Sequence, residues 1–225
     1  MKKLSKVLVC SAVVATAGFS QVAFAELSGN VGVTSNYIWR GTPQSSDESA
    51  ISGGLDYAHS SGLYVGTWVS SLGGGDQYEQ DWYAGFGGDA GPVNYDISYI
   101  SYTYPVGTSQ LDFDEVILSL GYGPATITYA PTVSKESGVN EDDVYMSLGL
   151  EFEVKKDLTL GILYGTYDID DAVGDPSSDY NHYQISLSKG DFTFAFDKKD
   201  PDVEDPTDVK DANRFSVTWS KSIDL

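Results

Sequence analysis

Cysteine, basic residues and long apolar runs are all scarce in this sequence. The single cysteine is Cys10, so a small secreted domain held together by disulfides is excluded. Only 13 lysines and arginines stand against 33 acidic residues, and so negative a chain would be repelled by the phosphates of nucleic acid. No stretch after residue 25 approaches the run of about 20 apolar residues that a spanning helix requires. A helical membrane protein is therefore excluded as well.

The first 25 residues have the features of a secretory signal peptide. Lys2, Lys3 and Lys6 form a basic head, an apolar stretch follows, and Ala23-Phe24-Ala25 has the small-x-small spacing of a cleavage site. Lipid attachment at Cys10 is the less favoured alternative. Loss of the three leader lysines leaves 10 basic and 33 acidic residues, a formal charge of −23, on a mature chain that begins near Glu26.

The mature chain shows almost no helical periodicity and much period-two alternation, which is typical of β-strands. The clearest case is 144–154, where Val144, Met146 and Leu148 alternate with Tyr145, Ser147 and Gly149. Twelve strands are predicted, at 27–40, 51–57, 63–70, 82–86, 93–99, 114–122, 125–130, 144–154, 158–164, 183–187, 192–196 and 215–219.

The links between these strands alternate in length. The odd-numbered links are long, at 41–49, 71–78, 104–112, 131–142, 168–179 and 197–212, whereas the even-numbered links are tight turns. An even-stranded meander with one short-looped end, where both termini lie, is the layout of a bacterial outer-membrane β-barrel. A soluble barrel or two-sheet sandwich is the alternative, but it has no reason to separate loop lengths in this way.

Strand parity then separates a lipid face from a lumen face. In 63–70, Leu63 and Val65 are expected to face lipid, while Tyr64 and Trp68 face the lumen. The same rule gives a predicted set of pore-lining residues, most of them acidic: Asp56, Asp81, Asp96, Glu115, Glu151, Glu153, Arg40 and Arg214.

Arg40 and Arg214 are the only arginines, and they occur in the first and last predicted strands. Because these strands must pair to close a barrel, the two side chains are expected to be neighbours at the outer mouth. Two interpretations remain open. The pair creates a field across the mouth together with facing acids, or it ties the closing seam to loop carboxylates.

More than half of the acidic residues fall in the six long links. Such a negative mouth concentrates cations, an effect screened beyond about 8 Å at physiological salt. The acidic stretches at 168–179 and 200–208 lack the ligand order of a helix-loop-helix calcium site, so solvated loops are the favoured interpretation.

Signatures of catalysis are nearly absent. The only histidines are His59, in a predicted short turn, and His182. His182 and Ser186 share a strand face but are roughly 13 Å apart along it, too far for a direct hydrogen bond. The glycines at 73–75 precede no helix and do not form a phosphate-binding loop. No enzyme activity, cofactor or metal site is predicted.

Residues 28–72 also carry a family resemblance. Their pattern includes Ser35-Asn36-Tyr37, Arg40-Gly41, Gly53-Gly54, Asp56-Tyr57 and Gly66-Thr67-Trp68. It resembles the N-terminal signature of the proteobacterial TorF-type porin family, which implies an outer-membrane barrel that acts as a channel. Two positions depart from that pattern: Pro43 replaces a small polar residue, and Leu225 ends the chain in place of an aromatic residue.

The sequence thus predicts a signal peptide at 1–25 and one all-β domain at 26–225, a transmembrane antiparallel barrel of about 12 strands in the bacterial outer membrane. The predicted function is a porin-like channel for passive diffusion of small solutes, with a preference for cations. A non-conducting barrel with a structural or surface-binding role and an outer-membrane barrel enzyme are the alternatives. Expected partners are outer-membrane lipids, lipopolysaccharide and small-molecule or ion solutes, and no nucleic acid.

Overall fold

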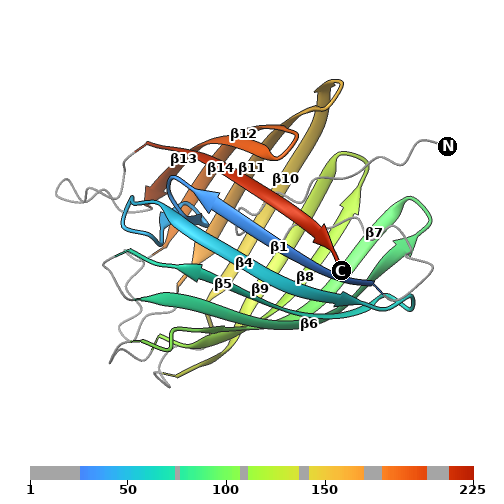
Figure 1. Cartoon of the computed structure of the whole chain (residues 1–225), viewed down its shortest axis with the longest axis horizontal. Helices are drawn as coiled ribbons and strands as arrows, with labels where there is room; N and C mark the ends of the chain where they lie inside the picture. Colours follow the sequence, from blue (N-terminus) through green and yellow to red (C-terminus); the bar gives the residue numbers. More distant parts are fainter. Residues whose placement is uncertain (1–25, 74–76, 107–110, 137–141, 170–178, 202–212) are drawn as a thin grey trace.

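Twelve antiparallel strands form one closed ring in the computed structural model of the chain (Figure 1). The structure describes residues 26–73, 77–106, 111–136, 142–169, 179–201 and 213–225, so the predicted signal peptide lies outside the described residues. The predicted fold class is confirmed. No helix among the described residues is long and apolar enough to cross a membrane.

The ring follows chain order, and its first strand pairs with its last. Its strands are β1 (Glu26–Thr34), β4 (Ala50–Ala58), β5 (Leu63–Ser71), β6 (Tyr78–Ala90), β7 (Val93–Thr103), β8 (Phe113–Tyr122), β9 (Ala125–Lys135), β10 (Val144–Lys155), β11 (Leu158–Asp168), β12 (Tyr180–Lys189), β13 (Phe192–Pro201) and β14 (Arg214–Asp224). The closing pair of β1 and β14 runs from Ser28 opposite Asp224 to Thr34 opposite Thr218. Because every strand is paired on both sides, the sheet has no open edge.

Short turns and long links lie at opposite ends of the ring, as the alternation of link length predicts. Four of the turns at the short end are two residues long, such as Gly123-Pro124 between β8 and β9. Both ends of the described chain lie at this end, where the Leu225 amide donates a hydrogen bond to the Leu27 carbonyl over 3.0 Å. The longest link within fully described residues is 35–49, at the opposite end (Figure 1).

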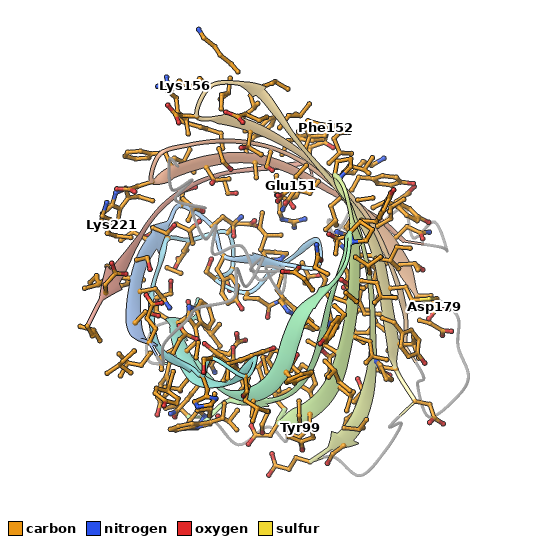
Figure 2. All side chains as sticks on the ribbon, turned by 90° about the vertical axis from the view of Figure 1, so that its right-hand side faces the viewer. Tyr99, Glu151, Phe152, Lys156, Asp179 and Lys221 are labelled. Atoms are coloured by element: carbon orange, nitrogen blue, oxygen red, sulfur yellow. The ribbon has the colours of Figure 1, made fainter. Side chains whose placement is uncertain are left out.

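The wall has an apolar outer face and a polar inner face. Ile51 on β4 is 65% exposed and Leu148 on β10 is 45% exposed, and both face outward, as do Leu63 and Val65 on β5. Ser119, Thr128 and Ser216 are buried on the inner face. Figure 2, a view along the ring, shows Phe152 on the outer side of β10 and Glu151 on the inner side. This distribution is the reverse of that in a soluble protein and is typical of a transmembrane barrel.

The predicted first strand, 27–40, is wrong in its second half. β1 ends at Thr34, and the chain then turns into the ring, where Ile38–Trp39 (β2) pairs with Thr42–Pro43 (β3). Tyr37 is consequently buried inside the ring, although strand parity would have placed it outside. The alternation continues past Thr34 in the sequence, but there it belongs to a hairpin inside the barrel. The predicted last long link also starts too early, because β13 extends to Pro201.

Candidate functional site

Residues 35–49, here called the inner loop, fold into the ring, and their hairpin of β2 and β3 lies inside it (Figure 2). Their hairpin of β2 and β3 turns at Arg40 and Gly41, whose φ angles are 47° and 78°. Two consecutive positive φ angles are what a two-residue hairpin turn of the I′ type requires. Glycine adopts this conformation at no steric cost, whereas Arg40 needs contacts that hold it there.

The guanidinium of Arg40 supplies those contacts. Its Nη1 and Nη2 donate hydrogen bonds of 2.7 Å to Oε1 and Oε2 of Glu115 on β8, a carboxylate with 0% exposure. The rings of Trp39, Tyr145 and Tyr167 lie 4.2, 4.0 and 5.2 Å from the guanidinium carbon. Two parallel charged hydrogen bonds and stacked aromatic faces are the arrangement that suits a buried arginine.

The charge state of this pair follows from its surroundings. Burial lowers the pKa of Arg40, but the adjacent Glu115 carboxylate more than offsets this, so the pKa of Arg40 lies above its ordinary value. The Tyr102 hydroxyl donates a further hydrogen bond of 3.3 Å to Glu115. Arg40 and Glu115 therefore form a salt bridge whose charges cancel within the lumen.

A second set of contacts joins the inner loop to β6. The Tyr37 hydroxyl donates a hydrogen bond of 2.6 Å to Oε1 of Glu79, and the Tyr104 hydroxyl donates one of 2.9 Å to Oε2. Burial raises the pKa of Tyr37 well above its ordinary value, and Glu79 raises it further. Tyr37 therefore remains protonated and acts as a donor. Its ring also packs edge-on against Trp68 on β5, with centroids 5.5 Å apart.

The tip of the hairpin rests on β12. A Cβ atom at Gly41 would lie 2.6 Å from Cβ of His182, so no larger residue fits without a shift. His182 stacks on Tyr145, and its Nε2 is 2.9 Å from the Tyr145 hydroxyl. The described hydrogen-bond partner of His182 is thus Tyr145 on β10.

Asp47, in the second half of the inner loop, joins this loop to β14. Oδ1 of Asp47 accepts hydrogen bonds from Nδ2 of Asn36, over 2.7 Å, and from Nε of Arg214, over 2.9 Å. The expectation that Arg40 and Arg214 lie together at the seam is wrong for their charged groups. Arg214 binds the loop beside the seam, whereas the Arg40 guanidinium contacts β8, β10 and β11 on the far side of the ring.

The other predicted lining residues lie on the inner parity of their strands. Asp56 on β4 accepts hydrogen bonds from the Tyr83 hydroxyl and from Nδ2 of Asn30. The Tyr64 hydroxyl donates one hydrogen bond that both carboxylate oxygens of Asp96, on β7, share, at 3.0 and 2.9 Å. Each of these carboxylates is thus paired with a tyrosine.

Glu151 and Glu153 are exposed near the short-turn end of β10, away from the inner loop. Figure 2 places Glu151 on the inner side of the ribbon. The structure therefore does not bring all eight predicted lining residues together. Arg40 and Glu115 meet directly, Arg214 is linked to the same loop through Asp47, and Asp81 lies two positions from Glu79 on β6.

Sequence reasoning missed three inner charges. Glu79 has the same parity as Asp81 on β6, and that parity alone could have identified it. Asp197 and Lys199 were assigned to the predicted long link at 197–212. In the structure they face inward on β13, where Asp197 accepts a hydrogen bond from Gln184 and Lys199 lies 3.8 Å from the Tyr180 ring.

No group of three or more histidine, cysteine or acidic side chains that could hold a metal occurs among the residues the structure describes. Most of the acidic stretch at 168–179, and 202–208 of the stretch at 200–208, lie outside those residues, so the prediction of solvated loops remains a prediction.

Comparisons with known proteins agree on the fold. The KdgM porin superposes with a TM-score of 0.59 at 8% identity, covering 88% of this chain and 99% of that one. The KdgM porin in complex with disordered oligogalacturonate gives 0.57 at 7% identity, with 89% and 99% covered. OccK10 (OpdN) of Pseudomonas aeruginosa reaches 0.42 at 12% identity, over 92% and 71%, which is too low to support an argument.

Sequence comparison gives one informative match. A family model described as a bacterial protein of unknown function (Gcw_chp) matches residues 20–222. A search of curated proteins finds no match. The structural matches, at such low identity, show that the chain has the fold of an outer-membrane porin.

Proposed function

For this chain, which belongs to the bacterial protein family of unknown function Gcw_chp, we propose the function of an outer-membrane channel that passes small solutes by passive diffusion and prefers cations. The observation that carries the proposal is the reversal of polarity across the wall. Apolar side chains cover the outside, and hydroxyl and carboxylate groups cover the inside. Such a wall is stable in lipid and presents polar groups to whatever occupies its interior.

The size of the ring is consistent with a narrow channel. Barrels of about eight strands are filled by their own side chains, whereas those of about sixteen enclose a wide aqueous channel. Twelve strands fall between these limits, and the inner loop occupies part of the interior. The resemblance of residues 28–72 to TorF-type porins supports the same function.

The balance of inner charges supports the preference for cations. Arg40 is neutralised by Glu115, and Arg214 is bonded to Asp47. Asp56 and Asp96, by contrast, have tyrosine and asparagine partners among the described residues, which donate hydrogen bonds but bring no positive charge. Unbalanced carboxylates in a low-dielectric wall attract cations and repel anions, and salt weakens the effect.

The same charges bear on the class of solute. The KdgM porin has been captured with oligogalacturonate, an acidic saccharide. The inner acids of this chain oppose such a ligand. The interpretation in which the two arginines orient a carboxylate-bearing solute is not favoured either, because both already bind carboxylates of the protein. Neutral and cationic small molecules fit the interior better.

The second candidate is a non-conducting barrel, and the inner loop favours it. Ile117, Ala130, Tyr145, Tyr167 and Tyr180 form a buried apolar cluster inside the ring, and Trp39 of the loop packs against it. A loop held by such a cluster as well as by salt bridges is a stable internal structure. It could close the lumen permanently.

Planar bilayer recording separates the two candidates. The purified barrel should give discrete conductance steps, with a reversal potential in a salt gradient that indicates cation preference. The double variant Arg40→Gln/Glu115→Gln, which removes the salt bridge without leaving an unpaired charge, serves as the comparison. Silence from both proteins would refute the channel. Conductance from the variant alone would show that the inner loop closes the lumen, and an anion-selective wild type would overturn the preference for cations.

A further inference from the structure

Glu79 and Asp81 form a close pair of carboxylates on the inner face of β6, near the end of the ring where the long links lie. Residues two apart on a strand point the same way and have Cα atoms about 7 Å apart. The exposed fractions of Glu79 and Asp81 are only 3% and 5%. Two like charges so close and so well buried repel each other and are costly to remove from water.

No basic side chain compensates this pair within the described chain. Among the described residues, Glu79 accepts hydrogen bonds from the hydroxyls of Tyr37 and Tyr104. Oδ1 of Asp81 is fully buried and has no hydrogen-bond partner among the described residues. By contrast, the predicted inner carboxylates of Glu115, Asp96 and Asp56 each accept a hydrogen bond from a described residue. The unpartnered oxygen is therefore evidence independent of the acidity of the pair. A buried carboxylate oxygen without a donor is costly, and a bound cation would offset that cost.

The free oxygen lone pairs suit a hard cation. Each carboxylate oxygen has about two lone pairs, so Glu79 keeps one on each oxygen after accepting from the tyrosines. Asp81 adds Oδ1, and the tyrosine hydroxyl oxygens lie at the same place. Calcium binds such oxygens with flexible geometry and completes its shell with water, whereas magnesium gives up its water reluctantly.

We propose that Glu79 and Asp81, together with the hydroxyls of Tyr37 and Tyr104, form a binding site for a Ca²⁺-type hard divalent cation inside the barrel. For its role the site rests on the proposed cation-preferring channel, since a divalent ion held there would obstruct the flow of monovalent cations. Its existence does not rest on conduction.

Terbium luminescence tests the site without requiring conduction. Tb³⁺ binds where Ca²⁺ does and emits strongly when a bound aromatic neighbour is excited, and Tyr37, Tyr104 and Trp68 adjoin this pair. The refolded full-length barrel in detergent is titrated with Tb³⁺ at neutral pH and then with Ca²⁺ as competitor. We expect Ca²⁺ to displace the sensitised signal.

Three variants show which carboxylates bind the Tb³⁺ ion. Asp81→Asn and Glu79→Gln should each weaken Tb³⁺ binding by about tenfold or more, because the number of ligand charges tunes calcium affinity over several decades. Asp96→Asn is the matched control: it removes another inner carboxylate next to a tyrosine, and it should leave the affinity unchanged. Asp81→Asn removes an unpartnered acid and is not expected to impair folding. Electrophoresis of unheated samples, in which a folded barrel migrates differently from the unfolded chain, checks this.

The Tb³⁺ titrations of the wild type and the three variants either support the site or overturn it. Weakening in Asp81→Asn and Glu79→Gln but not in Asp96→Asn supports the site, whether or not the barrel conducts. Absence of sensitised emission from the wild type means that a shared proton neutralises the pair, and it overturns the proposal. Equal weakening by Asp96→Asn, or an unchanged affinity in Asp81→Asn, does the same. A barrel that conducts but fails these tests retains its channel function without the site.

Discussion

Arg40 and Glu115, 75 positions apart in the chain, meet inside the barrel through two parallel hydrogen bonds of 2.7 Å. The arginine has a left-handed backbone, with φ at 47°, and the carboxylate has no exposed surface. Neither feature is stable alone, because the backbone is strained and the buried acid needs a counter-charge. Each residue therefore stabilises the position of the other.

Arg40→Gln should destabilise the barrel by about 3 to 5 kcal/mol, because it leaves Glu115 buried without its partner. Urea unfolding in lipid vesicles, followed by tryptophan fluorescence, measures this. Arg40→Gln/Glu115→Gln should recover most of the loss, since the unpaired charge is gone. Equal destabilisation of the single and double variants would show that the loss arises from packing and not from the salt bridge.

Gly41→Ala should cost more than about 1 kcal/mol, because the new Cβ meets His182 and the positive φ disfavours any side chain. Gly149→Ala is the control. A Cβ at Gly149, on β10, has no atom nearer than 3.9 Å, so this change should be close to neutral in the same unfolding experiment. If the two substitutions cost the same, the tip of the inner loop does not press on β12.

Leu148→Arg places a charge on the outward face of β10, where the native side chain is 45% exposed. A cost of about 2 to 4 kcal/mol is expected if this position faces the bilayer midplane. Gly149→Arg, on the inner face one position along, should cost less. Unfolding free energies in vesicles compare them, and a larger cost for Gly149→Arg would reverse the assignment of the two faces.

Cysteine labelling tests which end of the ring faces outward. Leu111→Cys and Glu136→Cys lie at the end with long links, and Ser60→Cys lies in the turn between β4 and β5. A thiol reagent that cannot cross the outer membrane should label the first two on intact cells and leave the third unlabelled. Labelling of Ser60→Cys alone would invert the topology.

Arg40→Gln combined with Arg214→Gln should raise the cation-to-anion permeability ratio, because it removes two positive charges from the interior and leaves the carboxylates. The ratio follows from the reversal potential in a salt gradient, and the difference should shrink as salt rises. If the ratio is unchanged while conduction persists, the two arginines serve only to hold the inner loop.

Local patterns in the sequence were sufficient to predict the ring and poor at predicting what fills it. Alternation along 144–154 correctly predicted which residues of β10 face outward and which face inward. This works because successive side chains of a strand point to opposite faces of the sheet. The same rule carried past Thr34 placed Tyr37 outside, because nothing local distinguishes a strand from a hairpin that folds inward. The Arg40–Glu115 pair depends on closure of the ring, which joins residues far apart in the chain. Lys199 was missed because strand ends are set by neighbouring strands more than by composition.

The inner loop also acts as a brace. It is attached to β6 through Tyr37 and Glu79, to β8 through Arg40 and Glu115, and to β14 through Asp47 and Arg214. β14 lies across the ring from β8 and β6, so at that level these opposite walls cannot move apart without stretching at least one of the attachments. At the end with the short turns, no loop among the described residues crosses the ring in this way. The barrel should therefore be stiff at one mouth and compliant at the other, and lateral pressure from the bilayer would change its shape chiefly at the end where the chain begins and finishes.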